Sequence, residues 1–229
     1  MTDPVPDLPK FAFDEVFVIT YGRSGSTLMQ GILNSIDGFH IKGENNGFVF
    51  KLFESYQLLA DTKKEHGSTN RPPTKPWYGL QTIDLDLIVD DLRKTVAHML
   101  ISKTVHNADT ACIGFKEIRH PEMGDQFGAY LDFLTLLFPK AGFVMLSRDL
   151  ADVAKSRWWG KKNKAWVMKT LSDYEVRARE YASGKDNCFS VTYADMVGQT
   201  DNFKAMFEFL GAPYNQDVID KTLAIPHSY

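Results

Sequence analysis

Five short apolar segments are spread along the chain, and their hydrophobic character is continuous instead of alternating with polar residues. They cover residues 16–20, 39–42, 111–116, 142–147 and 188–193. Continuous apolar runs of this length are typical of strands buried on both faces, as in a parallel sheet that helices cover. The pattern therefore predicts about five interior strands.

Between these segments, apolar residues recur at helical spacing and form four stripes. The stripes consist of Leu28, Met29, Ile32, Leu33 and Ile36; Leu85, Ile88, Leu92, Val96 and Met99; Phe127, Tyr130, Leu131, Leu134, Leu137 and Phe138; and Phe203, Met206, Phe207 and Leu210. Gly38, Pro139 and Gly211 follow three of them, as is typical of helix ends. Strands that alternate with helices predict an α/β fold. We expect one domain, residues 1–229, with segment 50–110 as a largely helical insertion.

Composition narrows the function classes. The 229 residues are 44% hydrophobic and 24% charged, with a net charge of −3. This balance gives no basis for bulk attraction to nucleic acid, so any anion site has to come from local residues. No apolar stretch resembles a signal peptide or a membrane span of about 18 residues. The sequence therefore predicts a cytoplasmic protein that has no membrane or nucleic-acid partner.

The two cysteines, Cys112 and Cys188, both lie in apolar runs. A disulfide between them stays open at this point. Two buried free thiols are favoured, because cytoplasmic proteins keep their thiols reduced.

A loop of small polar residues joins the first predicted strand to the first predicted helix. It lies in the stretch YGRSGSTL and consists of Gly22, Arg23, Ser24, Gly25, Ser26 and Thr27. A helix that begins after such a loop presents free backbone N–H groups and the positive end of its dipole to an anion. A nucleotide P-loop would have glycine in place of Thr20 and lysine in place of Ser26. Metal-dependent nucleotide hydrolysis is therefore disfavoured, and a tight turn without a ligand remains an alternative.

The segment RDLADVAKS supplies a second candidate anion site. Arg148 follows the fourth predicted strand, and Ser156 comes eight positions later in the next predicted helix. Eight helical residues span roughly 12 Å at most, so the guanidinium and the hydroxyl are able to close on one phosphate. Taken alone, Arg148 has a simpler interpretation as a surface ion-pair partner of Asp149 or Asp152.

Together, these two segments resemble the phosphate-binding segments of sulfotransferases that use 3′-phosphoadenosine 5′-phosphosulfate (PAPS). The R-S-G-S-T form is similar to that of carbohydrate and tyrosylprotein sulfotransferases. A third stretch, VTYADMV, followed by a helix ending in FEFLGAP, resembles the end of the same domain. The resemblance implies a P-loop-NTPase-like, three-layer α/β/α fold with a roughly five-stranded parallel sheet and the cofactor at the carboxyl ends of the strands.

The resemblance also implies roles for individual residues. The cofactor-binding residues would be Gly22, Arg23, Ser24, Gly25, Ser26, Thr27, Arg148, Ser156 and Tyr193. Loop 22–27 would wrap the 5′-phosphosulfate, while Arg148 and Ser156 would hold the 3′-phosphate. Glu44 would be the catalytic base, with His40 as the rival, and Arg23 and Lys116 would offset charge on the transferring group. The implied reaction is an in-line displacement that needs no metal and releases 3′,5′-ADP (PAP).

Candidate acceptor contacts are less specific. Lys116 and Arg119 match the lysine–x–x–arginine of carbohydrate sulfotransferases, and His120 follows directly. The insertion adds Trp77 and Tyr78, which suit a sugar. Each residue also has a structural interpretation: an ion pair of Lys116 with Glu117 or Glu122, the start of a loop at His120, or a core-closing aromatic pair.

We expect the acceptor to be a hydroxyl of a carbohydrate or small metabolite, and a homodimer is compatible with the sequence. Three alternatives remain open. They are a tyrosylprotein sulfotransferase-like activity, a non-catalytic PAPS- or phosphate-binding module, and, least favoured, a nucleotide kinase.

Overall fold

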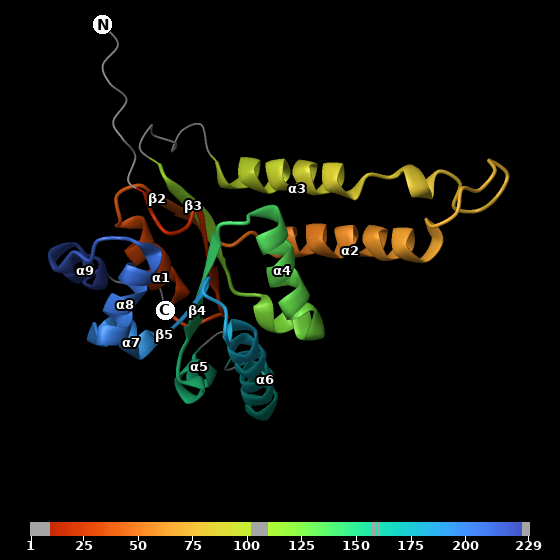
Figure 1. Ribbon diagram of the computed structural model, residues 1–229. Coiled ribbons are helices and arrows are strands. Elements are labelled where there is room, and N and C mark those ends of the chain that lie inside the picture. The colour runs from red at the N-terminus through yellow and green to blue at the C-terminus, as the bar shows by residue number, and fades with distance from the viewer. Residues whose placement is uncertain (1–9, 102–109, 157–158, 160, 226–229) are drawn as a thin grey trace, which may run out of the picture.

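The structure is a computed structural model that describes residues 10–101, 110–156, 159 and 161–225 (Figure 1). Its centre is a five-stranded parallel sheet in the order β2-β3-β1-β4-β5. The strands are β1 (Glu15–Ile19), β2 (Phe39–Lys42), β3 (Cys112–Glu117), β4 (Ala141–Ser147) and β5 (Cys188–Thr192). This confirms the predicted α/β class and places each strand within one residue of its expected bounds.

Helices connect the strands and cover both faces of the sheet. In chain order they are α1 (Ser26–Asn34), α2 (Phe48–His66), η1 (Leu80–Thr82), α3 (Leu85–Leu100), η2 (His120–Gln126), α4 (Phe127–Leu137), α5 (Leu150–Lys155), α6 (Lys164–Ala182), α7 (Tyr193–Gly198), α8 (Asp201–Leu210) and α9 (Gln216–Leu223).

The two faces of the sheet belong to two separate cores. Val16 and Val18 pack with apolar residues of α1, α8 and α9, whereas Phe17 and Ile19 pack with those of α3, α4 and α6. Alternate strand residues point to opposite faces, so a strand covered on both sides has to be apolar throughout. This three-layer arrangement explains the continuous apolar runs in the sequence.

Helices α2 and α3 run side by side and project from the body as an arm (Figure 1). Segment 67–84 joins them at the far end of the arm and contains η1. Val49 and Phe53 of α2 and Val96 of α3 are buried, but Leu58 and Leu87 are 70% and 61% exposed. The buried end of the arm therefore belongs to the core, and the far end is largely in solvent.

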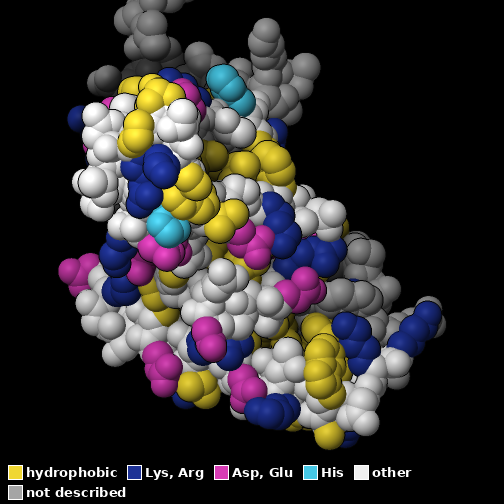
Figure 2. Space-filling view, turned by 90° about the vertical axis from the view of Figure 1, so that its right-hand side faces the viewer, with side chains coloured by type: hydrophobic (Ala, Val, Ile, Leu, Met, Phe, Trp, Pro, Cys, Tyr) yellow, Lys and Arg dark blue, Asp and Glu magenta, His cyan; other side chains and the backbone are white. Residues whose placement is uncertain are grey.

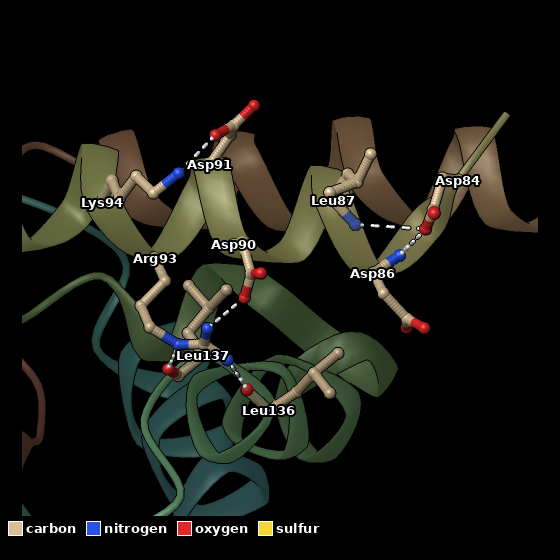
Figure 3. Close-up of polar contacts among 9 residues, drawn as sticks. All are labelled: Asp84, Asp86, Leu87, Asp90, Asp91, Arg93, Lys94, Leu136 and Leu137. Carbon is tan, nitrogen blue, oxygen red and sulfur yellow. Dashed lines mark hydrogen bonds and ion pairs between the residues drawn. The ribbon is translucent and has the colours of Figure 1, made fainter.

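Hydrogen bonds fix the start of α3 and its position on the body (Figure 3). Asp84 caps α3 by accepting hydrogen bonds from the backbone amides of Asp86 and Leu87. Arg93 donates from α3 to the carbonyls of Leu136 and Leu137 at the end of α4. These bonds satisfy terminal backbone groups of both helices.

Both cysteines are free thiols, which settles the alternative of a disulfide. Cys112 is buried as expected, whereas Cys188 is only partly buried. Among the described helices, none has the length and apolar character needed to cross a bilayer.

Candidate active site

The candidate residues come from four connections that follow parallel strands. Loop 22–27 follows β1, Glu44 follows β2, Lys116 lies near the end of β3, and Arg148 follows β4. Because the strands are parallel, their carboxyl ends meet at one edge of the sheet. Residues far apart in the sequence are therefore brought together there.

Loop 22–27 has an unusual backbone. Arg23 and Gly25 adopt positive φ angles of 72° and 94°. Ser24 is fully buried, and the Thr20 hydroxyl lies 2.7 Å from both the Ser24 hydroxyl and the Leu146 carbonyl. A left-handed arginine is a strained conformation that persists only when its surroundings fix it, and such strain concentrates at functional sites.

Helix α1 begins directly after this loop, and Ser26 and Thr27 form its first turn. Its N-cap residue is Gly25, which has no side chain with which to cap the helix. The first N–H groups of α1 are therefore available to an external acceptor, and the helix dipole favours an anion.

Two aromatic side chains, Tyr193 and Trp159, contact loop 22–27. The Tyr193 ring lies so close to Gly25 that a Cβ atom there would be 2.4 Å from Tyr193 Cδ2. Trp159 is buried and donates from its indole nitrogen to the Gly22 carbonyl at 2.9 Å. Tyr193 is the first residue of α7, not the last of a strand as expected.

Arg148 lies beside the loop and has spare donor capacity. Its guanidinium carbon is 4.1 Å from the centre of the Tyr193 ring, and Nη1 donates to the Arg23 carbonyl at 3.4 Å. The buried Nε of Arg148 and the buried Oγ of Ser156 have no hydrogen-bond partner within the described part of the chain. Ser156 follows α5 as its C-cap, so it lies just outside the helix in which it was expected.

Among the described residues, no carboxylate forms an ion pair with Arg148. Asp152 pairs with Lys155, and Asp149 caps α5, so the simple ion-pair interpretation of Arg148 is not what the described residues show. Buried polar groups normally have partners. Two unpaired donors at this edge fit a phosphate group.

The backbone of Arg148 is fixed by a residue that sequence reasoning missed. The Tyr21 hydroxyl accepts from the Arg148 amide at 2.9 Å and donates to Glu175 at 2.6 Å. Burial, reinforced by the Glu175 carboxylate, raises the pKa of Tyr21 far above its ordinary value. The phenol therefore stays protonated and able to donate to Glu175.

Glu44 and Lys116 form the second half of the site. The Lys116 ammonium contacts the Glu44 carboxylate, with the lysine side chain 7% exposed and the glutamate 39% exposed. Glu122, one of the expected lysine partners, lies instead 3.6 Å from Arg119. A carboxylate and an ammonium group are thus in contact with each other at the carboxyl edge of the sheet.

A cavity of about 550 Å³ opens at Glu44. Its walls include Phe48 from the start of α2, Met99 from the end of α3 and Phe115 from β3. Lys42, Asn45 and Asn46 add polar side chains to these apolar walls, and such a mixture is typical of a site for a small molecule.

The remaining acceptor candidates lie elsewhere. Trp77 stacks on His66 at a centroid distance of 4.4 Å at the far end of the arm, and Tyr78 beside it is 57% exposed. His120 is completely buried, and its Nδ1 lies 3.1 Å from the Thr20 amide. Burial lowers the pKa of His120 to about 4, so the ring is neutral near pH 7. The structure therefore places none of these three beside Glu44, and His40 lies within β2.

Charges of both signs are mixed on the face from which the arm projects (Figure 2). Attraction of an anionic ligand therefore depends on the local site and not on a uniformly basic surface.

The described residues contain no group of three or more His, Cys, Asp or Glu side chains placed to hold a metal ion.

Comparisons with known proteins agree with this geometry. The sequence profile of the sulfotransferase family matches residues 15–216. A sulfotransferase domain from the curacin biosynthetic pathway is similar in fold, with a TM-score of 0.53 and 14% identity over 92% of this chain and 77% of that one. The sulfotransferase STF9 from Mycobacterium avium is 14% identical over 95% and 68% of the two chains, with a TM-score of 0.44.

A search of curated proteins found no match. The family profile nevertheless covers most of the chain, and the fold agrees with it. This protein therefore belongs to the sulfotransferase family.

Proposed function

We propose that the protein transfers a sulfuryl group from PAPS to a hydroxyl group of a carbohydrate or small metabolite. The observation that carries the proposal is that Arg148 Nε, beside loop 22–27, and Ser156 Oγ, at the end of α5, are buried without partners, while the start of α1 is uncapped. One nucleotide with phosphates at both its 3′ and 5′ positions would satisfy both groups of donors. ATP lacks the 3′-phosphate and would leave Arg148 and Ser156 unpaired.

PAPS, when bound, supplies a sulfuryl group whose bond to the 5′-phosphate breaks during transfer. Glu44 accepts the proton of the acceptor hydroxyl while the hydroxyl oxygen forms the new bond to sulfur. Lys116 and Arg23 offset the negative charge that develops on the sulfuryl oxygens and on the departing phosphate. The free N–H groups of α1 and the hydroxyls of Ser26 and Thr27 hold the 5′-phosphate.

The cavity at Glu44 supports a small acceptor. Its volume of about 550 Å³ lies within the range usual for small-molecule sites. Phe48, Met99 and Phe115 offer apolar contacts to the carbon frame of the acceptor and exclude water from the proton transfer.

The proposal is tested by thermal unfolding with PAP, ADP or ATP–Mg²⁺, followed by transfer from radiolabelled PAPS to a panel of hydroxyl acceptors. A ligand that binds only the folded protein stabilises it by about 2.7 kcal/mol at a hundredfold excess over its Kd. We expect a shift specific to PAP in the wild type and in Glu44→Gln, but not in Arg148→Ala.

Other outcomes separate the alternatives. A shift with ATP–Mg²⁺ alone would contradict the proposal and favour a kinase. A PAP shift without transfer to any acceptor in the panel would favour a non-catalytic binding module. Ser156→Ala is the matched control for Arg148→Ala, because it removes a donor to the same phosphate without removing a charge.

A further inference from the structure

A buried carboxylate, that of Glu117, follows Lys116 directly in strand β3. Glu117 is only 1% exposed and accepts four backbone hydrogen bonds. Its Oε2 accepts from the amides of Asn45 at 3.3 Å and Gly47 at 3.0 Å. Its Oε1 accepts from the amides of Ile118 at 2.8 Å and Arg119 at 3.2 Å.

These four amides belong to the two connections that carry the proposed proton acceptor and its cation. Asn45 and Gly47 lie in the loop after β2, immediately beyond Glu44. Ile118 and Arg119 directly follow β3, which holds Lys116. The Glu117 carboxylate therefore links the loop after Glu44 to the end of β3, although its loop partners Gly47 and Asn45 lie 70 and 72 positions away in the sequence.

Glu117 acts from the opposite side of the strand. Successive residues of a strand point to opposite faces, so Lys116 faces the layer of α1 while Glu117 faces the layer of Phe115 and α4. Its carboxylate oxygens are both occupied by backbone amides. Phe115 on the same face lines the cavity at Glu44, but Glu117 is only 1% exposed and is not among the lining residues, so it is placed to hold the loop and not to touch an acceptor.

The loop that Glu117 holds contains a tight turn directly after Glu44. Asn46 and Gly47 are consecutive residues with positive φ angles, 57° and 75°. Asparagine and glycine are the residues that adopt left-handed conformations most readily, so the sequence favours a tight turn here but does not fix where the turn lies relative to β3. The two amides that converge on Glu117 Oε2 flank Asn46, so the carboxylate fixes the turn that aims Glu44.

We propose that Glu117 is a positioning residue that holds the Glu44 carboxylate against Lys116. The catalytic part of this inference rests on the proposed function, whereas the anchoring of the loop does not. Charge-assisted hydrogen bonds to a carboxylate are stronger than those to a neutral amide. A glutamine at this position would also turn an NH₂ group toward two N–H donors.

The test compares Glu117→Gln and Glu117→Asp with the wild type. Asp84→Asn is the matched control, since Asp84 also accepts two backbone amides but lies at the start of α3 on the arm. We expect Glu117→Gln to reduce kcat by about 10²-fold, the order of loss that a displacement of about 1 Å causes. The KM for PAPS and the Kd for PAP should change by less than about threefold, because loop 22–27 is untouched.

Hydrogen exchange provides a readout that does not depend on activity. The amides of Asn45 and Gly47 should exchange much faster in Glu117→Gln, and the shorter but charged Glu117→Asp should restore part of both protection and kcat. Asp84→Asn should lower the melting temperature without changing kcat. If Glu117→Gln should fail to fold, Glu117→Asp carries the same comparison.

A double variant tests whether Glu117 affects kcat through Glu44. In a Glu44→Gln background, Glu117→Gln should cost little further kcat, because the residue it positions is already inactive. An equal loss in both backgrounds, or unchanged exchange at Asn45 and Gly47, would overturn the inference. Absence of transfer by the wild type would refute the proposed function, and the exchange result would still decide whether Glu117 anchors the loop.

Discussion

The carboxylate of Glu44 and the ammonium of Lys116 are in contact at the carboxyl edge of the sheet, although 72 positions separate them in the sequence. The lysine is almost fully buried and the glutamate is open to the cavity. The pair thus has one member facing the cavity and one anchored in the protein.

This contact predicts that the two residues act as a unit. We expect Glu44→Gln and Lys116→Met each to lower kcat by about 10²- to 10⁴-fold, the range for loss of a positioned acid or base. The double variant should lose little more than either single one. Steady-state kinetics checks this, with Lys140→Met as control because Lys140 pairs with Asp14 before β1. Fully additive losses would contradict a joint role.

The contacts of Tyr21 predict an effect on nucleotide binding from inside the protein. Tyr21→Phe removes the hydroxyl that joins Arg148 to Glu175 and leaves a backbone amide without its partner. Loss of such a partner costs about 1–3 kcal/mol. We expect a lower melting temperature and weaker PAP binding, with binding of 5′-AMP much less affected. Calorimetric titration of both nucleotides measures this, and equal weakening of both would show that Arg148 is not the group disturbed.

The close approach of Tyr193 to Gly25 predicts that loop 22–27 tolerates no side chain there. Gly25→Ala adds a Cβ atom 2.4 Å from the tyrosine ring at a φ of +94°. Gly79→Ala is the control, since Gly79 has a φ of +81° but open space around it. We expect Gly79→Ala to cost about 1–2 kcal/mol from backbone strain alone. Gly25→Ala should cost more and should also abolish PAP binding, as chemical denaturation and titration would show.

The environment of Glu15 predicts a pH dependence of stability. Burial, with a smaller contribution from Asp14, raises the pKa of this carboxyl from 4.5 to about 7. The folded state therefore holds a proton that the unfolded state has already lost between these two values, and stability falls as pH rises through this window. Glu15→Gln should be more stable than the wild type above pH 7, and this advantage should disappear below pH 4.5.

Because Glu15 is partly exposed, we expect a gain of only about 1 kcal/mol at pH 8. Melting curves from pH 4 to pH 8 measure it. Glu15 starts β1, at the end of the strand away from loop 22–27, so kcat should not change. A gain that is constant over the whole pH range would refute the role of its ionisation.

The strands could be predicted because burial on both faces leaves a clear mark in the sequence. Helix α2 has no such pattern, since only Val49 and Phe53 are buried and its other residues are partly or fully exposed. The place of Trp77 depends on that helix. Nineteen residues of α2 carry the chain roughly 28 Å along the arm before Trp77 is reached. The spacing of apolar residues alone does not predict the direction in which α2 carries the chain away from the body.

The candidate site likewise has one part that the sequence predicts and another that it does not. Loop 22–27 and Arg148 follow apolar strands, so their meeting at one edge follows from the parallel topology. Glu117 looked like an ion-pair partner of Lys116, because the two are adjacent in the sequence. Two of its four hydrogen bonds, those from Asn45 and Gly47, depend on how the β2–α2 loop folds back, which no local pattern encodes. A charged residue within a buried strand is the one signal that could have indicated it.

The parallel sheet also has a consequence for the order of events in folding. The contacts that complete the site join residues far apart in the chain: Tyr21 with Glu175 across 154 positions, and Gly22 with Trp159 across 137. Such contacts carry a large loop-closure entropy and form only when the intervening strands are in register. We therefore expect the helices to form before loop 22–27 acquires its native contacts, and the proposed binding of PAP to develop late in folding.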